Sequence, residues 1–194
     1  MRKKIVVVQG HPDPAPERLC RGLAEAYAHG AEKGGHEVRR IDVAALDFPM
    51  LRSQAQFERG ALPPAIAEAQ DTLRWADHWV LVYPIWLGDA PALFKGFIEQ
   101  TFRPGFALRY RDGRIPQGLL RGKSARVIVT MGMPSLVYRF FFFAHGLRNL
   151  KRNVLNYAGV APVRTTLIGS AKGMQRDVAE KWLSDAEALG REAR

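Results

Sequence analysis

The 194-residue sequence has one cysteine, five histidines and no long apolar run. The single cysteine, Cys20, excludes an internal disulfide and a cysteine-based zinc or iron–sulfur site, and it is typical of a reducing compartment. The histidines show no paired ligand spacing, so no metal site is expected. A membrane span needs about 20 apolar residues, and the short apolar run at residues 5–8 fits a buried strand better than a signal peptide. We therefore expect a cytoplasmic protein with one domain over residues 1–194.

Acidic residues are missing from a long part of the chain. Between Gly113 and Arg176 there is no Asp or Glu, while Lys and Arg recur there, and the formal net charge of the whole chain is +10. Such an excess of positive charge attracts anions. The candidates are a phosphate-bearing cofactor, an anionic lipid surface, an acidic partner or nucleic acid, beside a solvated basic face with no dedicated partner. Nucleic acid is disfavoured because no known binding module occurs.

Three common phosphate-binding or catalytic motifs are also absent. The sequence has no G-x-G-x-x-G fingerprint, which argues against a Rossmann dinucleotide site, and no Walker phosphate loop. The G-x-S-x-G nucleophile elbow of α/β hydrolases does not occur either. The chemistry of this chain therefore has to be sought in other loops.

Strand and helix patterns alternate along the whole chain. The expected strands are short apolar runs, at residues 5–9, 38–43, 78–83, 124–130 and 163–168. The expected helices show apolar residues near helical spacing, at residues 17–34, 64–76, 91–102, 138–157 and 174–189. Residues 47–62 lack a clear period and are expected to form a loop, and Asp112-Gly113 indicates a small hairpin. This alternation predicts an α/β fold with a doubly wound, five-stranded parallel sheet in the order 2-1-3-4-5.

The most informative segment is YPIWLGDAPALFKG, residues 83–96. A buried strand stops at Pro84, crosses a short turn and enters a helix near Pro91. Turns at the carboxyl ends of parallel strands are where open α/β sheets hold planar cofactors. This turn offers backbone groups, the indole of Trp86 and one carboxylate, Asp89. Such a set suits holding a flat ring better than cleaving a bond.

Two further loops follow expected strands. His11-Pro12 comes after the first strand, and the next helix begins near Arg18, so free N–H groups and the helix dipole there favour a phosphate. Pro16 supplies neither an N–H nor a hydroxyl to such an anion. The second loop, Thr130-Met131-Gly132-Met133, follows the fourth expected strand.

These segments together resemble the flavodoxin-like NAD(P)H:quinone oxidoreductases of the flavodoxin_2 type. The resemblance implies that His11 and Arg18 contact the phosphate side of a flavin. It implies a first flavin turn made of Pro84, Ile85, Trp86, Leu87 and Gly88, and a second made of Thr130, Met131, Gly132 and Met133. It also implies that Tyr138 and His145 face the flavin and relay a proton during hydride transfer. The sequence departs from the family pattern at Pro16, Arg18 and Met133, where relatives usually have serine, asparagine and glycine.

The function implied by this resemblance is transfer of two electrons from NADPH or NADH, through bound FMN or FAD, to a quinone or similar acceptor. Modest length favours FMN, and the basic half of the chain favours NADPH. Two alternatives are a flavodoxin-like regulatory subunit of a membrane transport system and a cofactor-free scaffold.

Four successive phenylalanines, at residues 140–143, would point all round a helix. They therefore suggest a contact with another surface. A homodimer interface is the first interpretation, a peripheral membrane or transporter contact is the second, and the core of a monomer is the third.

Overall fold

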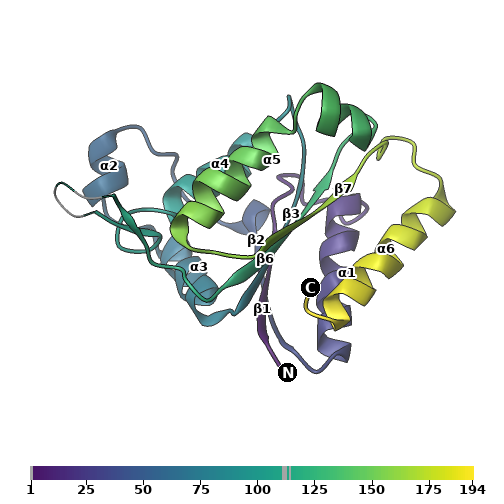
Figure 1. Ribbon diagram of the computed structural model, residues 1–194, viewed down its shortest axis with the longest axis horizontal. Coiled ribbons are helices and arrows are strands. Elements are labelled where there is room, and N and C mark those ends of the chain that lie inside the picture. The colour runs from purple at the N-terminus through teal and green to yellow at the C-terminus, as the bar shows by residue number, and fades with distance from the viewer. Residues whose placement is uncertain (1, 111–112, 114) are drawn as a thin grey trace.

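A five-stranded parallel sheet forms the centre of the computed structural model, which describes residues 2–110, 113 and 115–194 (Figure 1). The strands, in spatial order, are β2 (Glu37–Asp42), β1 (Lys4–Gln9), β3 (His78–Pro84), β6 (Ser124–Thr130) and β7 (Val163–Ile168). All neighbouring pairs are parallel. The predicted order 2-1-3-4-5 is therefore confirmed, with β6 and β7 as the fourth and fifth strands.

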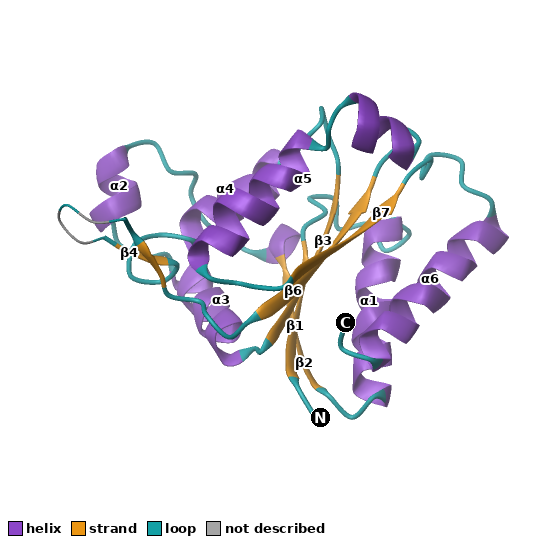
Figure 2. Ribbon diagram, in the orientation of Figure 1, coloured by secondary structure: helices purple, strands orange, loops and turns teal. Residues whose placement is uncertain are grey.

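Helices cover both faces of the sheet (Figure 2). One face carries α1 (Leu19–Lys33) and α6 (Arg176–Arg191), and the other carries α3 (Pro64–Trp75), α4 (Ala92–Thr101) and α5 (His145–Asn149). Side chains alternate along β1, so that Ile5 and Val7 join the core under α1 while Val6 and Val8 join the core on the other face. Among the described residues, no helix is both long and apolar enough to span a membrane.

The carboxyl ends of the strands all lie at one edge of the sheet, since every pair is parallel. The loops that leave this edge are residues 10–18 after β1, 85–91 after β3, 131–136 after β6 and 169–175 after β7. The three loops singled out in the sequence therefore lie at the same edge. That edge is where a doubly wound sheet binds ligands.

The segment expected to be a loop, residues 47–62, contains the short helix α2 (Gln54–Arg59), so that prediction was wrong. The hydroxyl of Ser53 accepts a hydrogen bond from the N–H of Gln56 and caps the helix. The buried Arg103, just beyond α4, donates to four backbone carbonyls of this segment, those of Gln56, Phe57, Gly60 and Ala61. A distant guanidinium thus fixes a segment that has no helical period of its own.

The helix expected over residues 138–157 is broken, which corrects a second prediction. Wide π-helical turns, η2 (Val137–Phe141) and η3 (Leu150–Asn156), flank the short α5. Phe143 and Ala144 adopt positive φ angles of 52° and 47°, and the N–H of Ala144 donates to the carbonyl of Tyr138 at 2.9 Å. Tyr138 is drawn into the core, and the chain makes a loop before α5 begins.

Smaller differences affect element boundaries. The second strand ends at Asp42, and Val43 opens a short 3-10 turn, η1 (Val43–Ala45), in which the Asp42 carboxylate accepts from the N–H of Ala44. The expected hairpin is confirmed as the antiparallel pair β4 (Leu108–Arg109) and β5 (Gln117–Gly118), although Asp112 of its turn lies outside the described residues.

The role of Arg103 leads to a testable prediction. Arg103→Ala leaves several carbonyls of residues 56–61 without their charged donor, and we expect a loss of about 2–4 kcal/mol in unfolding free energy. Hydrogen exchange should rise first at the amides of Phe57 and Gly60. The matched control is Arg109→Ala, an exposed arginine of β4. Unchanged protection of residues 54–60 in Arg103→Ala would contradict this account of α2.

Candidate functional site

A pocket of about 440 Å³ lies at the carboxyl edge of the sheet. Residues of the loops after β1, β3, β6 and β7 line it, together with the start of α1. The predicted cofactor-binding residues that line it are His11, Arg18, Pro84, Ile85, Trp86, Thr130, Met131 and Gly132. The structure thus brings the three sequence segments together around one cavity.

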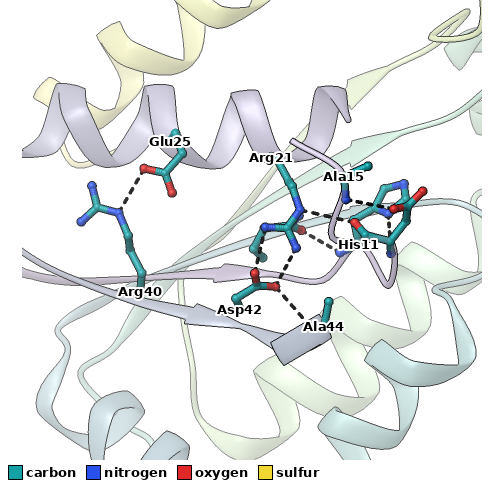
Figure 3. A network of polar contacts seen from close by, with 9 residues as sticks. His11, Ala15, Arg21, Glu25, Arg40, Asp42 and Ala44 are labelled. Carbon is teal, nitrogen blue, oxygen red and sulfur yellow. Dashed lines mark hydrogen bonds and ion pairs between the residues drawn. The ribbon is translucent and has the colours of Figure 1, made fainter. Parts of the chain in front are cut away.

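His11 joins the first loop to the third-strand turn. Its backbone N–H donates to Oε1 of Gln9 at 2.6 Å, and its Nδ1 accepts the N–H of Asp13 at 3.0 Å, contacts that Figure 3 shows among its dashed lines. Burial lowers the pKa of the imidazole, so the ring is neutral near pH 7, and the occupied Nδ1 leaves the proton on Nε2. The ring lies edge-on to the indole of Trp86, with centroids 5.9 Å apart. His11 therefore presents an N–H donor beside that indole.

The positive charge of Arg18 is partly neutralised. Its Nε donates to Oδ2 of Asp13 at 2.7 Å, and Arg18 occupies the position just before α1. The first N–H groups of α1 have no intrahelical partners, and Leu19 and Cys20, which carry two of them, line the pocket. Helix dipole and N–H groups therefore favour an anion here, while Glu17, also at the pocket, opposes one.

Arg21 fixes the start of α1 to the second strand (Figure 3). Its guanidinium makes two hydrogen bonds to the carboxylate of Asp42, at 2.8 and 3.1 Å, and a third to the backbone carbonyl of Asp13 at 3.3 Å. The same carboxylate accepts the N–H of Ala44. This bidentate pair holds the 10–18 loop and the first turn of α1 in one place.

The turn after β3 is a two-residue loop of type I′. Trp86 and Asp89 exchange backbone hydrogen bonds of 2.9 and 3.1 Å, and Leu87 and Gly88 have φ angles of 50° and 87°. The N–H of Ile85 donates to the carbonyl of Thr130. Within the described residues, the amides of Leu87 and Gly88 have no protein acceptor. Since the N–H groups of Ile85 and Trp86 are already bonded, Leu87 and Gly88 carry the free backbone donors of the predicted turn. Leu87 itself is fully exposed, and neither residue lines the pocket.

The turn after β6 leaves room at one residue. Apart from its two chain neighbours, no described residue has an atom within 4 Å of a Cβ added at Gly132, so the pocket is open beside this backbone. Met133 does not line the pocket, because its carbonyl accepts the N–H of Ser170 and its half-buried side chain packs against the core on the α3 and α4 face. The departure from the family pattern at Met133 therefore does not narrow the cavity.

The structure does not bring Tyr138 and His145 into the pocket. Tyr138 is buried, and its hydroxyl donates to the carbonyl of Gly88 at 3.4 Å and accepts the N–H of Leu147 at 3.3 Å. Burial raises the pKa of this phenol. His145 is exposed at the start of α5, with its ring 5.9 Å from that of Phe143. Tyr138 therefore holds the turn through the Gly88 carbonyl, and the proton relay expected of Tyr138 and His145 stays a prediction.

Five residues that line the pocket were not among the predicted site residues: Glu17, Leu19, Cys20, Ala171 and Lys172. Lys172 comes from the loop after β7. Because this loop leaves the same edge of the sheet as the other three, the position of Lys172 shortly after the last strand could have predicted that it reaches the pocket. Cys20 lies 3.1 Å (Sγ to Oγ1) from Thr130, and burial raises the pKa of its thiol to about 11. Cys20 therefore lines the pocket as an uncharged thiol near pH 7 and does not act as a nucleophile.

Residues 3–190 match the profile of the Flavodoxin_2 family, which is described as having a flavodoxin-like fold. The chain belongs to this family. It is 26% identical, over 168 residues, to an uncharacterized NAD(P)H oxidoreductase of Haemophilus influenzae, a match that covers 84% of this chain and 82% of that protein.

A second relative is the FMN-dependent NADH:quinone oxidoreductase 3 of Bacillus anthracis, 27% identical over 175 residues, which cover 81% of this chain and 82% of that protein. Among solved structures, the NAD(P)H:quinone oxidoreductase of Methanothermobacter marburgensis superposes with a TM-score of 0.85 over 100% of both chains. At 22% identity this likeness shows the fold alone.

Proposed function

We propose that this protein is a flavin-dependent NAD(P)H oxidoreductase that passes two electrons from a nicotinamide, through bound FMN, to a quinone-like acceptor. The observation that carries the proposal is the single pocket that joins the loop at His11, the turn at Trp86 and the turn at Gly132. The relatives named as NAD(P)H oxidoreductase and as FMN-dependent NADH:quinone oxidoreductase support the same activity.

The residues present fit a flavin mononucleotide. The cavity lies in the size range of cofactor pockets, and the open space at Gly132 leaves room for a ring to approach the backbone. Pro84, Ile85 and the half-exposed indole of Trp86 give it an apolar wall. When bound, FMN supplies the two-electron chemistry, and the protein supplies binding, orientation and electrostatics.

At the phosphate end, His11, Arg18 and Lys172 act with the first N–H groups of α1. Asp13 takes up part of the charge of Arg18, and Pro16 offers no N–H. Lys172 is then the cation at the pocket with no carboxylate partner among the described residues. We therefore assign to Lys172 most of the discrimination in favour of a phosphate.

At the ring end, Trp86, Thr130, Met131 and Gly132 line the pocket, and the free amides of Leu87 and Gly88, which do not line it, are the next donors along the turn. Tyr138 is a positioning residue, because it holds the Gly88 carbonyl. His145 precedes Gly146, whose added Cβ would lie 2.7 Å from that same carbonyl oxygen. His145 thus lies next to this turn and outside the pocket. From there it would contact the nicotinamide donor or the quinone acceptor.

The proposal has four finer parts. NADPH is the preferred donor, supported by the net charge of +10. The protein is a homodimer in which a second copy covers the exposed phenylalanines at 140–143. It is cytoplasmic, supported by the free thiol of Cys20. Residues 1–194 form one domain, supported by the family match over residues 3–190.

The two alternative functions have less support. The relatives and the solved neighbour reported above carry oxidoreductase names, so these comparisons do not support a regulatory subunit of a transport system. A cofactor-free scaffold was suggested by Pro16 and Met133, but Met133 lies outside the pocket and Lys172 adds a cation to it.

The direct test of the proposed activity is reconstitution. The purified chain, incubated with FMN and passed through a desalting column, should retain flavin absorbance and oxidise NADPH or NADH with a benzoquinone as acceptor. The rate should fall to background without flavin. A chain that stays colourless and gives the same rate with and without FMN would refute the proposed function.

The role of Lys172 is tested by comparing FMN with riboflavin, which lacks the phosphate. Lys172→Ala removes a charged donor, so we expect FMN to bind roughly tenfold more weakly and riboflavin to bind as before. Quenching of flavin fluorescence measures both dissociation constants. The control is Lys181→Ala, which removes a lysine paired with Asp185 on the surface of α6. Equal losses for FMN and riboflavin would contradict the assignment of Lys172 to the phosphate.

A further inference from the structure

A second pocket, of about 470 Å³, lies between the segment 135–151 and the edge strand β7. Three cationic side chains line it, Arg139, Arg148 and Lys151, and two hydroxyls, those of Ser135 and Thr165, lie at the same cavity. Among the described residues, no acidic side chain lines this pocket. The first pocket differs in this respect, because the carboxylate of Glu17 lines it together with Arg18 and Lys172.

The three cations of this pocket are not neutralised by the protein. Over the described residues, none of them forms a hydrogen bond or an ion pair with a carboxylate, whereas Arg21 and Arg40 each pair with one. The sequence between Gly113 and Arg176 has no acidic residue that could approach them from nearby. Like charges gathered at one cavity repel each other, and a bound anion relieves that repulsion.

We propose that this pocket is a binding site for an anion with two or more phosphate charges, separate from the flavin pocket. Arginine guanidinium groups match phosphate oxygens with paired donors, lysine adds a point charge, and the hydroxyls of Ser135 and Thr165 supply neutral donors. The loop after β6 contributes to both pockets, since Gly132 lines the first and Ser135 lines the second.

A second copy of the chain does not satisfy this pocket. Seated symmetrically over it, the copy would bring its own Arg139, Arg148 and Lys151 to the same place and add to the repulsion. Two sources of phosphate remain. One is a soluble nucleotide, and the other is an anionic lipid headgroup. Both present the same chemistry to the three cations.

The test uses adenosine 2′,5′-bisphosphate as the soluble probe, in titration calorimetry with the FMN-saturated protein. We expect binding at one site per chain, weakened at least roughly tenfold in the double variant Arg148→Gln/Lys151→Gln. Lys181→Gln is the matched control and should bind the probe as the wild type does. Retention of FMN by each variant shows that the fold and the flavin pocket remain intact.

The lipid source is distinguished by sedimentation with vesicles of phosphatidylglycerol and of phosphatidylcholine. Binding to the anionic vesicles alone, lost in the double variant and without binding of the soluble probe, assigns the site to a headgroup. Failure of both probes to bind, or binding that the double variant leaves unchanged, would overturn the proposal. Because FMN retention is measured separately, either result leaves the proposed oxidoreductase activity standing.

Discussion

A hydrogen bond of 2.8 Å from the N–H of Ile85, just after β3, to the carbonyl of Thr130, the last residue of β6, continues the β3–β6 pairing. It holds the turn at Trp86 against the turn at Gly132, and the pocket opens between them. The Arg21–Asp42 pair brings α1 to the same edge, and the Tyr138 hydroxyl holds the Gly88 carbonyl from below. The site therefore forms because the carboxyl ends of the parallel strands lie at one edge of the sheet.

Much of the fold follows from the sequence because its signals are local. The apolar runs of β1, β3 and β6 are buried on both faces, which gives a continuous pattern that predicts strands of a parallel sheet. Once the strand order is known, the loops at His11, Trp86 and Gly132 must lie at one edge. The fold and the family predicted from these segments are confirmed.

The features that escaped prediction depend on contacts between distant residues. Helix α2 depends on Arg103, some 45 residues further along the chain, and no pattern within residues 47–62 indicates this. The break at Phe143 and Ala144 follows from the burial of Tyr138 under the turn at Gly88. Lys172 enters the pocket through a loop whose path depends on where β7 ends. The cofactor-binding and catalytic roles of all the predicted site residues stay predictions, including those of the residues that line the pocket.

The open space beside Gly132 is where we propose that the flavin ring binds, and a titration of Gly132→Val with FMN probes that space. Apart from Gly132 itself and its two chain neighbours, no described atom lies within 4 Å of an added Cβ, so we expect the variant to fold and melt like the wild type. We expect its FMN dissociation constant to rise by about tenfold or more, because the new methyl groups occupy the space that the ring needs. A folded Gly132→Val protein that binds FMN as tightly as the wild type would contradict the account.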